Sequence, residues 1–236
     1  AAASLERFPR VAADLHERTG VDPQLRHTGA LYLALTADEE AALRLPPDAL
    51  RQHHPECRWL ESRELRELEP EVSPLFRGAL YVPWEWQVLS PRLVQAYARA
   101  AALGGVRIRE TVEVRGVERE GDRVTALLTS DGRLAVGQVV LAAGAWSGHL
   151  GRLFGLSLPV GPLRGQIVRL AAWGPTVRHS LYRGELYIGA KADGTVAVGS
   201  TEELVSFDRR PTGAGLALLS RFAVETVPAL GQATFL

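Results

Sequence analysis

Three short turn sequences in the second half of the chain constrain its fold more than any other feature. Residues 120–122 (EGD), 130–132 (SDG) and 193–194 (DG) each separate runs in which apolar and polar residues alternate. Turns of this composition between alternating runs are typical of β-hairpins. Because parallel strands need longer crossover connections, so many hairpin turns argue against a purely parallel sheet.

Helical patterns occupy much of the first half. Residues 4–19 carry apolar side chains at the spacing of one helix face, with Pro9 expected in the first turn. Residues 91–105 give the clearest helix, with Ser90 as its N-cap and two glycines at its end. Its expected packing face carries Leu93, Val94, Tyr97 and Ala101. We further expect helices at residues 37–45, 62–69 and 215–226. Strands are expected at residues 29–36, 78–83, 106–110, 165–170 and 185–201. Three or four more strands are expected within residues 112–144. The sequence therefore predicts a mixed α/β (α+β) fold.

Composition limits the classes of function. The 236 residues have a formal net charge of zero, which argues against a nucleic-acid-binding surface or an electrostatic membrane anchor. No apolar run approaches the roughly 18 residues that a membrane span needs, and no signal peptide is recognisable. Cys57 is the only cysteine and can form no intrachain disulfide, which fits a reducing interior. We expect a cytoplasmic protein whose partners are small molecules.

Residues 139–150, VVLAAGAWSGHL, are the strongest candidate for a binding site. They predict a buried strand at residues 139–144 that runs into small side chains before a helix. Free amides at a helix start, beside side chains too small to block a ligand, suit an extended cofactor that carries phosphate. Small residues also allow a helix to pack tightly on a sheet, and this stretch alone leaves both interpretations open.

Other kinds of site have weaker support. His53, His54 and Cys57 lie close together, but adjacent histidines point apart and zinc-type spacing is missing, so we expect no metal site. No GxSxG motif surrounds Ser147 or Ser200, which argues against a serine hydrolase. The sequence also contains neither GxGxxG nor GxxxxGK[ST].

Seven segments, in this order, resemble the FAD-dependent amino acid oxidases of the D-amino-acid oxidase superfamily, and glycine oxidase most closely. The segments are GVDPQLRHTGALYLALTADEEAAL, LRELEPEVSPLFRGALYVP, TVEVRGVEREG, VVLAAGAWS, LPVGPLRGQIV, LYRGELYIGAKADGTVAVGSTEE and VPAL. The resemblance implies an incomplete GR2-type Rossmann-like FAD-binding domain at residues 1–20 and 91–150. An antiparallel-sheet substrate-binding domain, residues 21–90 and 151–236, would be interleaved with it.

The family pattern also contains parts that this sequence does not have. Family members begin with a strand and a GxGxxG turn, and end with a segment whose arginine grips the substrate carboxylate; neither occurs here. The sequence has no methionine either. We therefore expect a fragment that lacks both ends of such an enzyme.

The resemblance assigns four residues to the FAD cofactor. Val114 matches the residue whose backbone holds the adenine edge. Ala143, Gly144 and Trp146 match the end of a strand that passes close to the cofactor, where small size and free amides would matter.

The substrate side of the resemblance rests on two tyrosines. Tyr187 matches the tyrosine that faces the substrate and helps to bind its carboxylate, and Tyr182 is a further candidate for the pocket wall. Both would orient the substrate, and no residue is assigned to acid–base catalysis. Lys191 stands where the family has an arginine, and Glu185 where glycine oxidase has a histidine; the role of each stays open. Arg164 matches a stretch that we interpret as structural.

The implied reaction is the oxidative deamination of glycine, another small amine or a D-amino acid. The substrate would become an imine and then a 2-oxo acid and ammonia, while oxygen is reduced to hydrogen peroxide. A role in thiamine biosynthesis and a homo-oligomeric state are further implications, and the 236-residue chain alone would be inactive. The alternative is a truncated or degenerate module of the same fold that serves as a scaffold or subunit.

Overall fold

The computed structural model describes residues 2–44, 56–171 and 177–236, and the chain splits into two compact units. Unit 1 comprises Ala1–Gly104, Gly165–Thr201 and Arg210–Leu236. Unit 2 comprises Gly105–Arg164 and Glu202–Arg209. Each unit is therefore assembled from segments that are distant in the sequence, and each is considered by itself.

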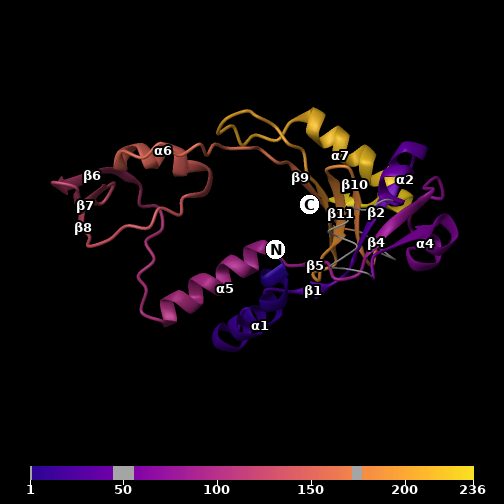
Figure 1. Ribbon diagram of the computed structural model, residues 1–236, viewed down its shortest axis with the longest axis horizontal. Coiled ribbons are helices and arrows are strands. Elements are labelled where there is room, and N and C mark those ends of the chain that lie inside the picture. Colours follow the sequence, from indigo (N-terminus) through magenta and orange to yellow (C-terminus); the bar gives the residue numbers. More distant parts are fainter. Residues whose placement is uncertain (1, 45–55, 172–176) are drawn as a thin grey trace. The chain divides into compact units, whose positions relative to one another are not determined.

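Unit 1 is built on an eight-stranded sheet with the order β13-β9-β12-β11-β10-β2-β4-β3 (Figure 1). The strands are β13 (Thr234–Phe235), β9 (Ile167–Ala171), β12 (Thr195–Gly199), β11 (Leu186–Ala190), β10 (Ser180–Arg183), β2 (Ala30–Ala34), β4 (Gly78–Val82) and β3 (Arg58–Glu61). Only the β2–β10 pair among these neighbours is parallel. The hairpin expected at residues 193–194 is confirmed: β11 and β12 pair antiparallel, and Gly194 adopts a positive φ of 82°.

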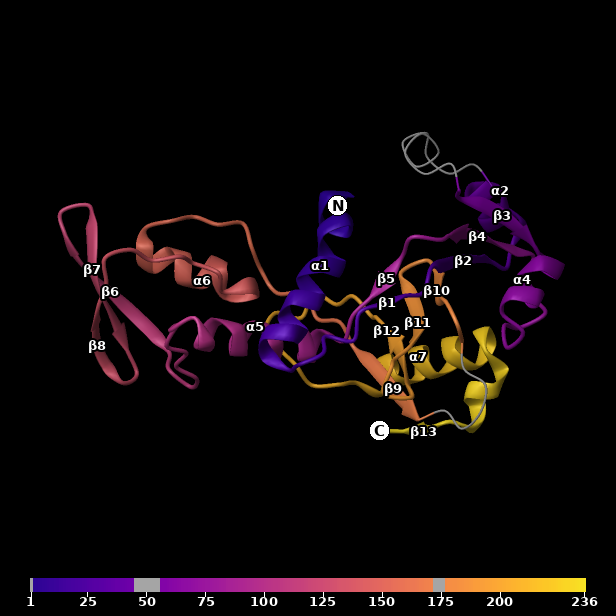
Figure 2. The same ribbon diagram turned by 90° about the horizontal axis from the view of Figure 1, so that it is seen from below.

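The larger of the two buried apolar clusters of unit 1 packs between this sheet and α7. The described helices of the unit are α1 (Ala2–Thr19), α2 (Ala37–Arg44), α4 (Ser62–Leu68), α5 (Ser90–Leu103), α7 (Gly213–Thr226) and the short η3 (Pro228–Gln232). Helix α7 contacts β9 and β12, and Figure 2 shows it beside these strands. Leu219 and Phe222 of α7 pack there with Leu181, Ile188 and Val198 of the sheet. Alternation along the strands sends every second side chain to the opposite face, which α7 leaves free.

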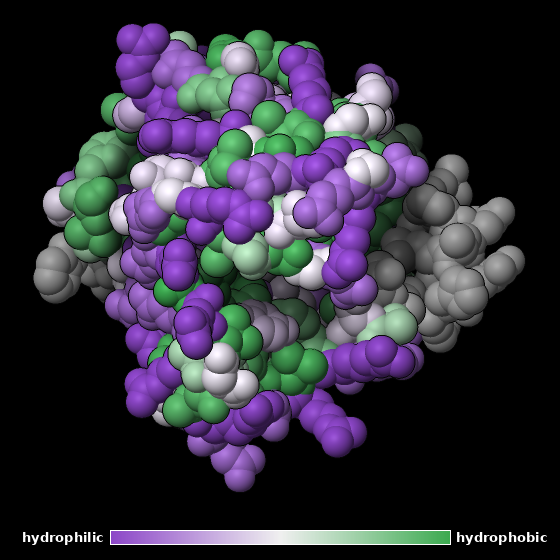
Figure 3. Space-filling view, turned by 90° about the vertical axis from the view of Figure 1, so that its left-hand side faces the viewer, coloured by the Kyte–Doolittle hydropathy of each residue, from purple (hydrophilic) through white to green (hydrophobic). Residues whose placement is uncertain are grey.

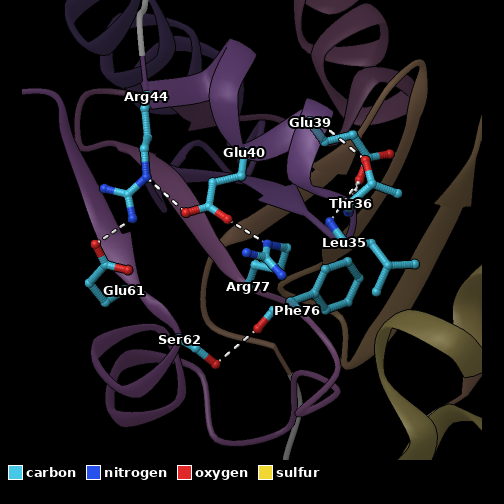
Figure 4. Close-up of polar contacts among 9 residues, drawn as sticks. All are labelled: Leu35, Thr36, Glu39, Glu40, Arg44, Glu61, Ser62, Phe76 and Arg77. Atoms are coloured by element: carbon cyan, nitrogen blue, oxygen red, sulfur yellow. Dashed lines mark hydrogen bonds and ion pairs between the residues drawn. The ribbon is translucent and has the colours of Figure 1, made fainter.

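Polar contacts fix α2 to the sheet at its first turn (Figure 4). The Glu39 carboxylate accepts hydrogen bonds from the backbone amides of Leu35, at 2.7 Å, and Thr36, at 3.0 Å. The Thr36 hydroxyl accepts in return from the Glu39 amide at 3.2 Å. Glu40 forms an ion pair with Arg77, which immediately precedes β4. Capping and ion pairing together set the position of this short helix.

Unit 2 contains a three-stranded antiparallel sheet and short helices. Its strands are β6 (Val114–Glu120), β7 (Arg123–Thr129) and β8 (Gly132–Ala135). Gly121 and Gly132 adopt positive φ angles of 60° and 107° at the two turns, so both hairpins expected from the sequence are confirmed. The helices are η1 (Gly144–Trp146), α6 (Ser147–Gly151) and η2 (Arg152–Phe154).

Two expected strands are absent from the described chain. Residues 106–110 and 139–144 form no strand, and within the described residues no other strand pairs with them. Val140 is 90% exposed, whereas a central strand would be buried. A strand of a parallel sheet is held by hydrogen bonds to neighbours, and apolar composition cannot replace them.

Three details of the helices also differ from expectation. Leu89 rather than Ser90 is the N-cap of α5, since Ser90 already lies inside the helix. α1 begins at Ala2, so Pro9 lies inside the helix rather than in its first turn. α5 buries Ala96, while Val94 and Tyr97 on its expected packing face are exposed. Apolar spacing identified the helices correctly but did not fix their ends or the side that packs.

The described helices include none whose length and apolar character would suit a passage through a lipid bilayer.

Candidate functional site

A cavity of about 630 Å³ lies within unit 2. Three of the four residues that the resemblance assigns to the cofactor line this cavity: Val114 at the start of β6, Ala143, and Trp146. Gly144 lies between the last two in η1 but does not line the cavity. The complete lining is Val112, Glu113, Val114, Ala143, Trp146, His149, Leu150 and Phe207. Folding therefore brings residues from three parts of the sequence to one space.

The glycines of this region have two different functions. A Cβ atom on Gly148, in α6, would overlap the backbone carbonyl of Val160, so this glycine permits a close approach within the protein. Gly144 instead has a positive φ of 52°, and a Cβ there would meet no atom within 4 Å. The backbone at Gly144 is therefore exposed, whereas that at Gly148 is covered by the protein.

An aromatic pair forms one wall of the unit 2 cavity. The rings of Trp146 and Phe207 stack with centroids 5.2 Å apart and an interplanar angle of 26°. Phe207 belongs to the distant segment Glu202–Arg209, which joins unit 2 through paired backbone hydrogen bonds of 2.9 Å between Arg164 and Glu203. Sequence reasoning did not select Phe207, because no local pattern indicates that this loop returns to residues 144–146.

The side chain of Arg164 holds the segment Glu202–Arg209 by ion pairs. Its guanidinium pairs with the carboxylates of Glu203 and Asp208 and is largely buried. These contacts agree with a structural role for Arg164.

Large hydrophobic side chains of unit 2 are exposed. Figure 3 shows hydrophobic residues between hydrophilic ones on one face of the molecule. The exposed hydrophobic residues of unit 2 include Val106, Ile108, Val140, Trp146 and Phe207. Of these, Trp146 and Phe207 line the cavity, and exposed apolar side chains at a cavity are a common property of binding sites.

The cavity residues fit part of the FAD molecule that the resemblance implies. The volume lies in the range of roughly 300–1,000 Å³ that is usual for small-molecule sites. Trp146 offers an aromatic ring, and the open space at Gly144 leaves the backbone accessible to a ligand. The pyrophosphate would need further donors, since the sequence contains no GxGxxG turn.

A row of three tyrosines crosses three adjacent strands of unit 1. Tyr182 of β10 pairs in register with Tyr187 of β11 and with Tyr32 of β2. The rings of Tyr32 and Tyr182 stack at 5.0 Å, and those of Tyr182 and Tyr187 lie 6.1 Å apart. The structure thus brings together the two predicted tyrosines and adds Tyr32. Only the parallel pairing of β2 with β10 reveals this third residue, since about 150 positions separate the two strands in the sequence.

The three phenol groups are half-buried and remain protonated well above neutral pH. Burial, followed by the negative charge of Glu85, raises the pKa of Tyr182 to about 12. Burial also raises the pKa of Tyr187, and burial and Glu85 together raise that of Tyr32. Within the described residues none of the three hydroxyls forms a hydrogen bond to the protein, so each can donate one to a ligand.

The structure shows the surroundings of Glu185 and Lys191, the two residues whose roles the sequence left open. Glu185 is exposed in the tight turn between β10 and β11, beside Gly184 with its positive φ of 58°. Lys191 is half-buried, and its ammonium group donates a hydrogen bond to Gln87 Oε1 at 2.9 Å.

The candidate metal ligands give no described cluster. His53 and His54 lie outside the described residues, while Cys57 is described and packs against the same small apolar cluster as Tyr32. Among the residues that the structure describes, no group of three His, Cys, Asp or Glu side chains is placed to hold a metal ion.

Comparison with known proteins gives consistent matches over nearly the whole chain. The DAO family model, described as FAD dependent oxidoreductase, matches residues 1–235. The glycine oxidase of Pseudomonas putida is 36% identical over 98% of this chain, and that of Geobacillus kaustophilus is 34% identical over 96%. The crystal structure of glycine oxidase from Geobacillus kaustophilus matches 100% of this chain and 64% of its own chain, with a TM-score of 0.94 and 33% identity. The chain spans 62% and 60% of the length of the two curated relatives.

Proposed function

The chain belongs to the DAO family of FAD-dependent oxidoreductases, and from this premise we propose that it forms part of an amino acid oxidase. The observation that carries the proposal is the similarity to glycine oxidases over 98% of the chain. Glycine is the proposed substrate, with other small amines and D-amino acids as alternatives. The proposed products are an imine, hydrolysed to a 2-oxo acid and ammonia, and hydrogen peroxide.

In this proposal the tyrosine row orients the substrate. Tyr187 donates a hydrogen bond from its hydroxyl to the substrate carboxylate, and Tyr182 forms the adjacent wall. Because burial keeps both phenols protonated, both remain hydrogen-bond donors throughout the physiological pH range. Bonds of this kind fix the position of Cα and reduce the entropic cost of reaching the reactive geometry.

The unit 2 cavity is the proposed contact surface for FAD. The Val114 backbone, the small residues Ala143 and Gly144, and the ring of Trp146 are the proposed binding groups. When bound, FAD supplies the two-electron oxidation of the amine and is reoxidised by oxygen. The protein supplies position and shape, which agrees with the lack of any assigned acid–base pair.

A peroxide assay of the whole protein with glycine, sarcosine and D-alanine tests the proposal. We expect activity with at least one of them and a flavin absorption band in the purified enzyme. Tyr187→Phe should raise KM about tenfold or more, because a hydrogen bond to a charged group is lost. Tyr97→Phe, on the exposed face of α5, is the matched control and should leave KM unchanged.

Two results would favour a scaffold or subunit of the same fold instead. These are the absence of peroxide with every substrate, and a colourless preparation that stays colourless after FAD is added. The 236-residue chain by itself is proposed to be inactive, since its sequence contains no GxGxxG turn. The thiamine role, the cytoplasmic location and the homo-oligomeric state remain proposals that rest on family resemblance and composition.

A further inference from the structure

Two cationic side chains of unit 1, Lys191 and Arg26, lie close enough for their charges to interact, and neither has a carboxylate partner among the described residues. Lys191 directly follows β11, and Arg26 lies in β1 (Arg26–His27), which pairs with β5 (Trp86–Gln87). Arg26 is opposite Gln87 in that ribbon, and its Nη1 atom donates to the Ala190 carbonyl at 3.4 Å. Among the described residues, neither cation takes part in an ion pair.

The side chain of Gln87 connects the β1–β5 ribbon to β11. A Cβ atom on Gly189 would lie 3.2 Å from Gln87 Oε1, so the carboxamide occupies the space left by this glycine. The same oxygen accepts the hydrogen bond from Lys191. The carboxamide nitrogen forms no hydrogen bond within the described residues and remains available as a donor.

The carboxylate of Asp193, which lies near Lys191, already pairs with Arg169. Asp193 accepts a hydrogen bond from Arg169 at 2.7 Å and further bonds from Thr195. Burial lowers the pKa of Lys191, and the positive charges of Arg169 and Arg26 add to this effect while Asp193 opposes it. The local group of Arg26, Lys191, Arg169 and Asp193 has three positive charges and one negative, a net charge of 3 − 1 = +2, in a chain whose formal net charge is zero.

We propose that Lys191, Arg26 and the carboxamide nitrogen of Gln87 form a binding site for an oxyanion, a carboxylate or phosphate group of a small molecule. The polar groups that these three side chains leave unpaired are all donors, because the acceptor oxygen of Gln87 is held by Lys191. An anion bound there would reduce the electrostatic repulsion between Lys191 and Arg26 in the folded protein. The site is distinct from the tyrosine row and does not depend on the proposed oxidase activity.

Lys191 makes the test unusually direct, because it is the only lysine in the sequence. Reductive methylation with ¹³C-formaldehyde gives one side-chain NMR signal, besides that of the α-amine, and preserves the positive charge. The full chain is titrated with malonate and with phosphate, and with sodium chloride at matched ionic strength. We expect a saturable shift of the Lys191 signal and a higher pKa of its ammonium group in the bound state. Calorimetric titration of the unmodified chain checks that methylation has not created or removed the site.

Two variants separate specific binding from general charge effects. Arg26→Gln should weaken binding about tenfold, since one charge-assisted hydrogen bond is lost. Arg63→Gln is the control: Arg63 is strongly exposed on α4, pairs with Glu67 and should leave the titration unchanged. A ¹H–¹⁵N spectrum confirms that each variant is folded.

The outcomes distinguish the source of the oxyanion and can reject the site. Saturation by malonate alone assigns a carboxylate ligand, and saturation by phosphate alone assigns a phosphate ligand. A linear response equal to that of chloride would show screening only and overturn the proposal. An unchanged affinity in Arg26→Gln would also overturn it.

Discussion

At the scale of single residues, the two glycines beside the unit 2 cavity should respond differently to the same substitution. Gly148→Ala places a methyl group on the Val160 carbonyl, and we expect a loss of about 1–3 kcal/mol from the resulting backbone shift. Gly144→Ala meets no neighbour and should cost only about 1 kcal/mol for its left-handed backbone. Urea unfolding of both variants measures the difference. Equal losses would contradict the distinction between packing and open space.

The tyrosine row gives a prediction for alkaline solution. The ordinary tyrosine pKa is about 10, whereas that of Tyr182 is raised to about 12. Because the folded-state pKa is the higher one, the associated stability is fully present below about pH 10 and is lost as pH rises toward 12. Absorbance at 295 nm should therefore show a late phase of ionisation. This phase should shrink in Tyr182→Phe, and an unaltered titration curve would argue against the buried environment.

At the scale of elements, the N-terminus of α7 depends on a side-chain cap. The Thr212 hydroxyl accepts a hydrogen bond from the Gly215 amide at 3.1 Å and another from Gln166 Nε2 at 3.1 Å. Thr212→Ala should lower the free energy of unfolding by about 1 kcal/mol. Ser220→Ala, whose hydroxyl bonds to the Leu216 carbonyl within the same helix, is the control and should have a smaller effect. Thermal or urea unfolding provides the comparison.

The sequence predicted elements well where the signal was local. The turns at Gly121, Gly132 and Gly194 were identified because positive φ angles favour glycine whatever the tertiary context. Residues 139–144 were assigned wrongly because an apolar run reports a preference for burial, while a strand also needs hydrogen-bonding neighbours. The packing face of α5 was also missed, since apolar side chains such as Val94 occur on both sides of the helix.

At the scale of the molecule, the two units have unequal cores. Within the described part of unit 2, Ala126 is the only hydrophobic residue that is fully buried, whereas unit 1 contains an extensive apolar cluster. We expect amide hydrogen exchange to be faster in β6–β8 than in β9–β12. Residues 137–143, with no strand partner among the described residues, should exchange fastest. Comparable protection in both sheets would refute this expectation.

The division into functional domains remains a prediction at this scale. The cofactor candidates Val114, Ala143 and Trp146 lie in unit 2, and the tyrosine row lies in unit 1. The boundaries expected from the sequence, with a cofactor domain at residues 1–20 and 91–150, divide the chain by function. The two compact units divide it by packing contacts. Cofactor-binding measurements on variants in each unit would test the functional division.

The sequence by itself determined the family, the mixed fold and the hairpin turns, and it selected Tyr182 and Tyr187 as candidates, because each depends on local patterns or on the order of segments. The tertiary structure alone decided that Tyr32 joins Tyr182, that Phe207 stacks on Trp146, and that Gln87 reaches Lys191 across Gly189. These contacts join positions that are distant along the chain. They arise from the pairing of strands and from loops that fold back onto distant segments. Both depend on packing throughout the core, so no single stretch of sequence indicates them.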